Sequence, residues 1–119
     1  MTIRLVEESC ELTGAKLSVS ILSLENATLV LVTDKRNQYR IGTVALAMPI
    51  TGRTGEAPPS ILTLFGSGGG LLAKALAGRI SNRTGKTVLS IVGLMDDDLG
   101  TVSSILRVSE RILEKMSST

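Results

Sequence analysis

Residues 27–33 (ATLVLVT) decide the fold, because they are apolar at both odd and even positions. Successive side chains of a β-strand point to opposite faces of the sheet, so a strand of this kind is expected to be covered on both faces. Residues 41–48 (IGTVALAM) and 88–94 (VLSIVGL) have the same pattern. Together the three segments predict the central strands of a sheet in which neither face is suited to water.

Further strands are predicted on either side of residues 27–33. A strand over residues 3–12 and a turn at Gly14 precede residues 16–24 (KLSVSILSL), where apolar and polar positions alternate. Residues 34–38 (DKRNQ) are expected to be a polar hairpin tip and residues 39–48 the returning strand. Four sequential strands with short links predict an antiparallel meander. A loop with three prolines and two glycines follows at residues 49–60, and then a short strand at residues 61–65 (ILTLF).

The second half predicts two helices separated by a strand. Leu72, Leu76 and Ile80 recur every four residues with Ala75 beside them, which makes one apolar stripe on a helix over residues 71–83. Gly85 is suited to the left-handed cap of that helix, and residues 87–94 read as a strand. A second helix opens at Asp96, Asp97 and Asp98 and runs to about residue 116. Its buried stripe is predicted to be Leu99, Val102, Ile105, Leu106, Val108, Ile112, Leu113 and Met116.

The predicted fold class is α/β (α+β), and residues 1–119 are expected to form one domain. The elements follow one another in the order β-β-β-β-loop-β-α-β-α. Two helices cover one face of an antiparallel sheet of about six strands. Since the other face is also apolar, the simplest second layer is another copy of the sheet, packed face to face in a homodimer. A related chaperone chain in place of the identical copy is the alternative. The predicted dimer-interface residues are Leu17, Val19, Ile21, Val30, Val32, Val44 and Leu46.

Composition argues against catalysis and against several kinds of partner. The 119 residues include no histidine, so a Ser–His or Cys–His nucleophile cannot form and zinc loses its commonest nitrogen ligand. The net charge of +2 and the 2% aromatic content do not favour nucleic-acid binding. A single cysteine, Cys10, fits a reducing compartment and is expected to be buried and inert. No apolar run approaches the ~20 residues of a membrane helix, so a cytoplasmic protein without metal or cofactor is expected.

Few segments qualify as binding sites. Residues 66–70 (GSGGG, from Gly66 to Gly70) precede a helix and form either an anion site or, the favoured interpretation, a flexible connection that allows close helix–sheet packing. The acids Asp96, Asp97 and Asp98 are interpreted as a helix cap and not as a metal site. Partner binding is predicted for the basic tip and for the proline-rich loop. The residues concerned are Lys35, Arg36, Arg40, Arg53, Thr54, Gly55 and Glu56.

The order of elements and several local sequences resemble the small proteasome assembly chaperones, in particular the third eukaryotic proteasome assembly chaperone and its archaeal relatives. The likeness runs over residues 9–112 and includes CELTG at 10–14, LVLVT at 29–33, IGTVAL at 41–46 and RVSERI at 107–112. The chain departs from the family pattern in the glycine run and in the loop around Arg53. The resemblance implies two sheets packed face to face in a dimer flanked by helices. It also implies binding to proteasome α subunits during assembly of the α-ring and the 20S core particle.

Two other classes of function remain as alternatives. A roadblock- or longin-like dimeric scaffold for a small GTPase has a similar size, but such folds place a long helix between the second and third strands, where this sequence predicts none. An anion- or nucleotide-binding protein would depend on residues 66–70.

Overall fold

The computed structural model describes residues 4–12, 15–34, 42–49, 60–66, 70–94 and 99–117. The strands are β1 (Arg4–Leu12), β2 (Ala15–Ser23), β3 (Ala27–Asp34), β4 (Thr43–Met48), β5 (Ser60–Gly66) and β6 (Thr87–Val92). The helices are α1 (Gly70–Thr84), between β5 and β6, and α2 (Leu99–Ser117), after β6. The α+β class and the order of elements are those that the sequence predicts. Residues 50–59 of the predicted loop and the acids at 96–98 lie outside the described residues.

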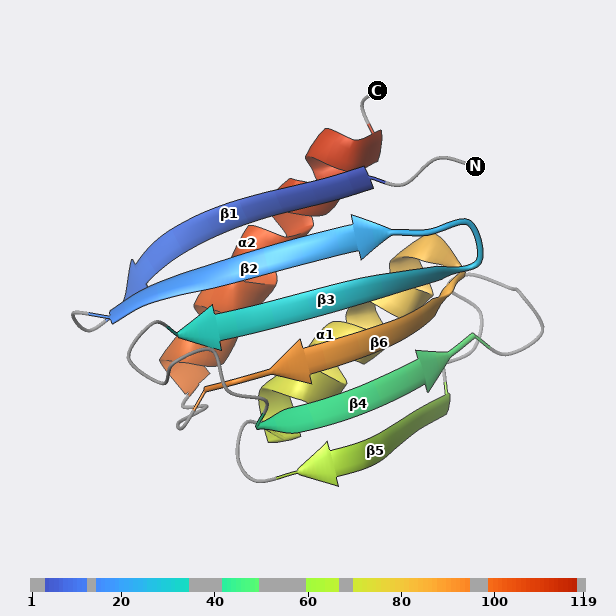
Figure 1. Cartoon of the computed structure of the whole chain (residues 1–119), viewed down its shortest axis with the longest axis horizontal. Helices are drawn as coiled ribbons and strands as arrows, with labels where there is room; N and C mark the ends of the chain where they lie inside the picture. The colour runs from blue at the N-terminus through green and yellow to red at the C-terminus, as the bar shows by residue number, and fades with distance from the viewer. Residues whose placement is uncertain are drawn as a thin grey trace.

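All six strands lie in one sheet in the order β1-β2-β3-β6-β4-β5 (Figure 1). The first three form the predicted antiparallel meander. Beyond β3 the prediction is wrong, because β6 lies between β3 and β4, parallel to β3 and antiparallel to β4. Residues 34–38 are therefore not the tip of a β3–β4 hairpin. A parallel neighbour needs a long crossover connection, and the chain between β3 and β6 supplies one that contains β4, β5 and α1.

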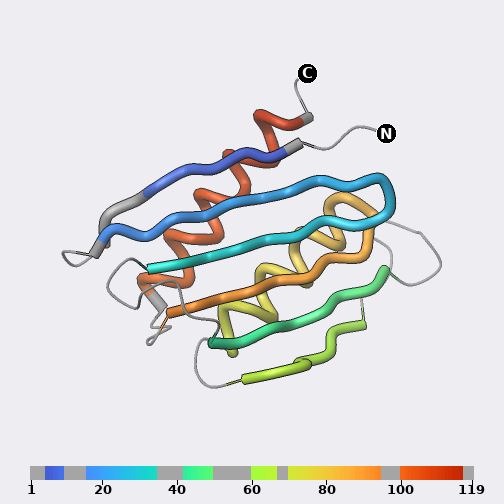
Figure 2. The backbone as a smooth tube through the Cα atoms, in the orientation of Figure 1, coloured from blue at the N-terminus to red at the C-terminus, as the bar shows by residue number. Residues whose placement is uncertain are grey.

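Both helices lie on the same face of the sheet (Figure 2). α1 packs against β4, β5 and β6, while α2 packs against β1 and β2, and the two helices contact each other. Neither helix in the described part of the chain combines the length and the apolar content that crossing a membrane requires.

The buried stripes of the helices are largely those expected. Leu72, Leu76 and Ile80 are buried on α1, together with Ala73 and Ala77, whereas Ala75 is only half-buried. On α2 the predicted stripe is confirmed for every residue of it whose side chain is described. The buried ones are Val102, Ile105, Val108, Ile112 and Leu113, and the partly buried ones are Leu106 and Met116. Burying an aliphatic side chain contributes about 1.5–3 kcal/mol, so this aliphatic layer holds the helices to the sheet.

The end of α1 has the predicted glycine cap. Gly85 has a φ of 72° and its N–H donates to the Ser81 carbonyl at 2.8 Å. The Thr84 hydroxyl donates to the Ile80 carbonyl at 2.7 Å, and the Ser81 hydroxyl donates to the Lys86 carbonyl at 2.8 Å. The Gly85 bond satisfies a carbonyl of the last helical turn, and the Ser81 bond ties the helix end to the chain that leads into β6.

Candidate functional site

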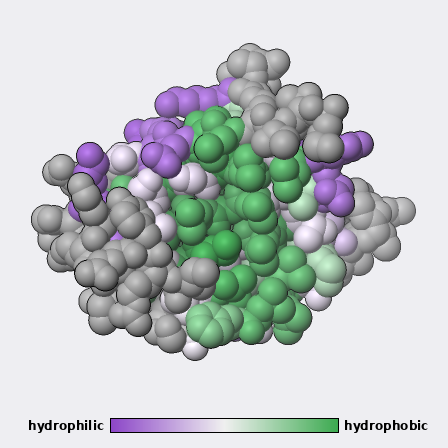
Figure 3. All heavy atoms as spheres, in the orientation of Figure 1, coloured by the Kyte–Doolittle hydropathy of each residue, from purple (hydrophilic) through white to green (hydrophobic). Residues whose placement is uncertain are grey.

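The face of the sheet opposite the helices carries a broad apolar surface, shown in green in Figure 3. Its side chains alternate along each strand with those buried under the helices. On β3, for example, Val30 and Val32 are buried, whereas Leu29 and Leu31 point to the other side, where Leu31 is exposed. No described helix covers this surface, which we call the open face.

One row of leucines crosses the open face from edge to edge. The strand registers pair Leu5 with Leu22, Leu22 with Leu29, Leu29 with Leu89, Leu89 with Leu46, and Leu46 with Leu62. Directly paired residues have Cβ atoms about 4.5–5.5 Å apart, so the six side chains form a continuous ridge, called here the leucine row. Its two ends are the most open, with Leu5 64% and Leu62 55% exposed.

The neighbouring row of paired residues divides the open face into two parts. It is apolar from β3 to β5, where Leu31, Ile91, Val44 and Phe65 are paired in turn, and Phe65 is 56% exposed. On β1 and β2 the same row carries Glu7 and Ser20, and the Ser20 hydroxyl donates to Glu7 Oε2 at 2.9 Å.

Ser9 and Ser18 are paired in the next row and complete a polar corner of the open face. This polar corner is defined by Glu7, Ser9, Ser18 and Ser20. The apolar surface therefore extends over β3, β6, β4 and β5 and reaches the β1 edge only through the leucine row.

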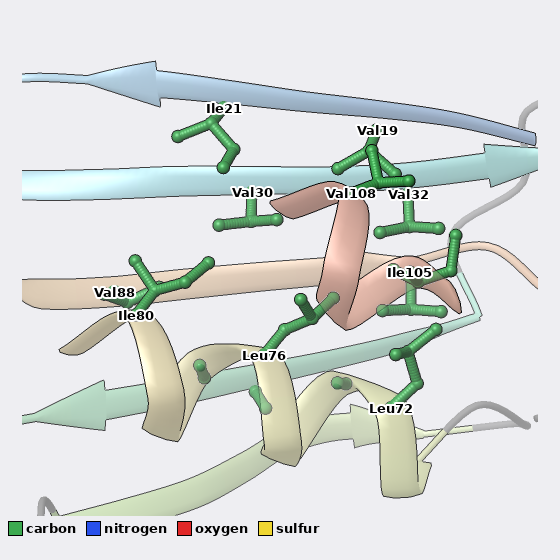
Figure 4. Close-up of a cluster of buried hydrophobic side chains, with 14 of the residues drawn as sticks. Val19, Ile21, Val30, Val32, Leu72, Leu76, Ile80, Val88, Ile105 and Val108 are labelled. Atoms are coloured by element: carbon green, nitrogen blue, oxygen red, sulfur yellow. The ribbon is translucent and has the colours of Figure 1, made fainter. Parts of the chain in front are cut away.

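The predicted dimer-interface residues lie mostly on the wrong side of the sheet for a face-to-face contact. Five of them are buried beneath the helices within the same chain: Leu17, Val19, Ile21, Val30 and Val32. Figure 4 shows four of these five clustered with side chains of α1 and α2. Only Val44 and Leu46 lie on the open face. The prediction failed because the better alternation on β2 marks the face that the chain covers itself.

The predicted partner-binding residues lie outside the described part of the chain, which includes neither residues 35–41 nor residues 50–59. The described residues that flank the two segments lie at opposite ends of β4. Asp34 and Gly42 bound the first segment, and Met48 and Ser60, which are paired, flank the second.

The other candidate sites gain little support. Gly66 closes β5 and Gly70 opens α1, while residues 67–69 lie outside the described chain. A Cβ at Gly70 would meet nothing within 4 Å, so close packing does not require a glycine there. The closer approach is at Gly78, where a Cβ would lie 2.8 Å from Ile61 Cδ1, the far end of a side chain on β5; no local pattern in the sequence predicts this contact. Cys10 lies in β1 as expected, though its side chain is not among those described.

A cleft of about 320 Å³ lies on the helix side of the sheet, near the C-terminal ends of both helices. Arg83 and Lys86 line it together with Ile21, Leu113 and Met116. Lys86 Nζ donates to the Leu24 carbonyl at 3.0 Å and to Ser23 Oγ at 3.4 Å, which ties β6 to the turn between β2 and β3. Among the described residues no group of three His, Cys, Asp or Glu could hold a metal ion.

These features define an α+β protein with an open six-stranded sheet, helices on one face and an apolar surface on the other. No protein-family model matches the sequence, and no curated protein matches it. A chain from a crystal structure of a novel chaperone complex for yeast 20S proteasome assembly has the same fold, with a TM-score of 0.69 over 99% of this chain and 98% of that one. The two sequences are 16% identical, so the likeness is one of fold.

Proposed function

We propose that this chain is a non-catalytic assembly chaperone that forms a homodimer through the open face and binds proteasome α subunits while the α-ring of the 20S core particle is built. The observation that carries the proposal is the leucine row, which leaves a sheet apolar on both faces with helices on only one. Further support comes from the fold shared with a chain of a proteasome assembly chaperone complex. The same proposal includes a role without catalysis and a cytoplasmic location.

A second copy of the chain suits the open face better than a different occupant. A two-fold dimer brings the same patch of both subunits together, so the patch must be complementary to itself. Apolar side chains meet this condition, because they introduce no like charges and leave no buried polar group without a partner. A stable interface needs about 800 Å² from each partner, so the proposed dimer would engage most of the apolar surface over the four adjacent strands β3, β6, β4 and β5. The polar corner then lies at the rim.

Assistance in assembly requires only a difference in affinity between two states of the partner. A chaperone that binds an α subunit more tightly in the incomplete ring than in the finished particle favours the intermediate and leaves on completion. The proposed contacts are the basic segment with Lys35, Arg36 and Arg40 and the proline-rich segment with Arg53, Thr54, Gly55 and Glu56. Charged side chains suit transient binding, because they favour a fast and specific encounter more than a high affinity.

The dimer is tested by placing a charge in the leucine row. Leu89 lies on β6 between Leu29 and Leu46, and it is half-buried in the single chain. Leu89→Arg should produce a folded monomer, because a face-to-face dimer would bury two unpaired charges at its centre. Ser18→Arg is the matched control, since it places the same side chain on the same face within the polar corner. Light scattering coupled to size-exclusion chromatography should give a dimer for the wild type and the control. A monomeric wild type would refute the dimer.

The partner is tested by capture of purified proteasome α subunits on the immobilised wild-type chain. The double substitution Arg53→Ala/Glu56→Ala should weaken capture by about tenfold without changing the mass of the dimer, since two charged contacts are lost. Lys35→Ala/Arg36→Ala/Arg40→Ala tests the other segment separately. Failure of the wild-type dimer to retain any α subunit would refute the chaperone role and leave the dimer standing.

A further inference from the structure

The outer edge of β5 is the least protected element of the described chain. β5 is the last strand of the sheet, and all seven of its residues are exposed. Its sequence, SILTLFG, contains no charged residue and no proline. Ile61 lies on the helix side, where it contacts α1, while Leu62 and Phe65 lie on the open face. The edge is therefore flanked by apolar side chains on both faces of the sheet.

The opposite edge of the sheet is protected in the usual way. Natural sheets place charges on their edge strands or cover them, which prevents unwanted pairing with other chains. β1 carries Glu7 and Glu8 and is covered by α2. Glu8 Oε2 lies 3.1 Å from Lys115 Nζ and Oε1 lies 3.7 Å from Arg111 of the same helix. The contrast between the two edges singles out β5 as an edge that is left available.

The backbone of β5 determines what this edge can bind. β5 pairs with β4 on one side, and no described strand pairs with its other side. The backbone N–H and C=O groups on that side alternate along the strand. An extended polypeptide presents C=O and N–H groups at the same spacing, so it can form hydrogen bonds with both kinds of group. The register with β4 is continuous over residues 60–63 and irregular at Leu64, so residues 60–63 are the regular part of the edge.

We propose that the outer edge of β5 docks an extended, uncharged segment of a client polypeptide as a seventh strand of the sheet. The proposal rests on the chaperone role and specifies a contact for it. A second copy of the chain is the less suitable occupant, because a stable interface takes about 20–30 residues from each side and this strand has seven. A short edge of this size suits an occupant that must leave. The dimer uses the open face, and strand docking uses the backbone edge, so both can be engaged together.

The probe for this edge is a synthetic peptide containing TVALAM, the sequence of β4, flanked by lysines for solubility. β4 already pairs with the inner edge of β5, so its side chains are compatible with a neighbouring position in the sheet. Amide hydrogen exchange of the full-length ¹⁵N-labelled chain is measured by NMR with and without the peptide. Amides of β5 should exchange at least about tenfold more slowly in its presence. A control peptide, TVPPAM, should give no protection, since its two adjacent prolines remove a donor from each edge of the peptide strand.

A variant of the chain separates edge docking from other contacts. Ile61→Lys places a charge beside the edge and should weaken peptide binding by about tenfold without changing the mass of the dimer. Leu71→Lys is the matched control, because Leu71 is a similarly exposed apolar residue on α1 and not on β5. It should bind the peptide as the wild type does.

The outcomes distinguish this proposal from the dimer. Unchanged β5 exchange at saturating peptide, or protection confined to β3 and β6, would overturn strand docking while leaving the dimer intact. Protection of β5 in a chain that proves to be monomeric would support strand docking and refute the proposed dimer.

Discussion

Two glycines, one within α1 and one directly after it, serve different purposes at the scale of single residues. Gly85 follows α1 with a φ of 72°, and its N–H completes the helix cap. Gly78 lies within the helix and faces Ile61 of β5. The first is needed for its backbone conformation, whereas the second lies against the flexible end of the Ile61 side chain. Substitution by alanine tests the two purposes separately.

We expect Gly85→Ala to lower the free energy of unfolding by about 1–2 kcal/mol, because a left-handed conformation brings Cβ too close to the following carbonyl oxygen. The φ of 72° lies in the region that side chains rarely adopt. Urea denaturation followed by circular dichroism measures the change. An unchanged midpoint would mean that Gly85 is not held in the capping conformation in solution.

Gly78→Ala is the matched control and should have the opposite sign or no effect. Alanine in a helix interior is favoured over glycine by about 0.5–1 kcal/mol. The new Cβ would meet only Ile61 Cδ1, the far end of a side chain that is 42% exposed and free to rotate away. Larger residues at position 78 should destabilise the chain, since they would displace the Ile61 side chain of β5 altogether.

The sequence predicted the Gly85 cap from the local pattern. The contact of Gly78 depends on β5, which is distant along the chain, so it leaves no local signal.

At the scale of elements, local patterns predicted which segments are strands and helices but not which strands are neighbours. The alternation in β2 and the four-residue spacing in α1 are short-range properties that a sequence displays directly. The place of β6 between β3 and β4 depends on contacts between distant segments, and short links alone favoured a meander. The apolar character of β6 on both parities was the available signal, because it fits a central position and not an edge.

The ion pairs between β1 and α2 hold the β1 edge of the sheet to the helix, and their contribution to stability can be measured. Glu8 has a side chain only 18% exposed and lies near Arg111 and Lys115 of α2, although its contact with Lys115 lacks hydrogen-bond geometry. We expect Glu8→Ala to destabilise the chain by only about 1 kcal/mol. The effect is small because Arg111 and Lys115 are exposed, so solvent screens their charges. Hydrogen exchange should increase in β1 and the second half of α2 and stay unchanged in α1.

Glu7→Ala is the control for that prediction. Glu7 is the neighbouring acid on the opposite face, where it accepts a hydrogen bond from Ser20 and makes no contact with α2. Its removal should leave exchange in α2 unchanged. Faster exchange of α2 in both variants would show that loss of charge on β1, and not the contact of Glu8 with the helix, is responsible.

At the scale of the whole molecule, the sequence predicted that both faces of the sheet are apolar but not which residues form each face. The central strands carry apolar residues on both parities, so their patterns cannot distinguish the helix side from the open side. The polar residues Ser18 and Ser20 on β2 could have done so, because they oppose Leu17, Val19 and Ile21 and belong to the face without helices. The leucine row requires in addition the pairing of β6 with β3 and β4, which the sequence did not reveal.

The open face leads to a prediction about stability that needs no partner protein. If two copies fold and associate in one step, unfolding produces two chains from one dimer, and the apparent stability rises with concentration by about 1.4 kcal/mol of dimer for each tenfold increase. The melting temperature of the wild type should therefore rise over a hundredfold range of concentration, whereas that of Leu89→Arg should stay constant and lower. Because the contact is apolar, the rise should persist when the salt concentration increases, since ions screen charges and not hydrophobic contacts. A melting temperature that is independent of wild-type concentration would mean that the open face remains in contact with water, and the proposed dimer would be wrong.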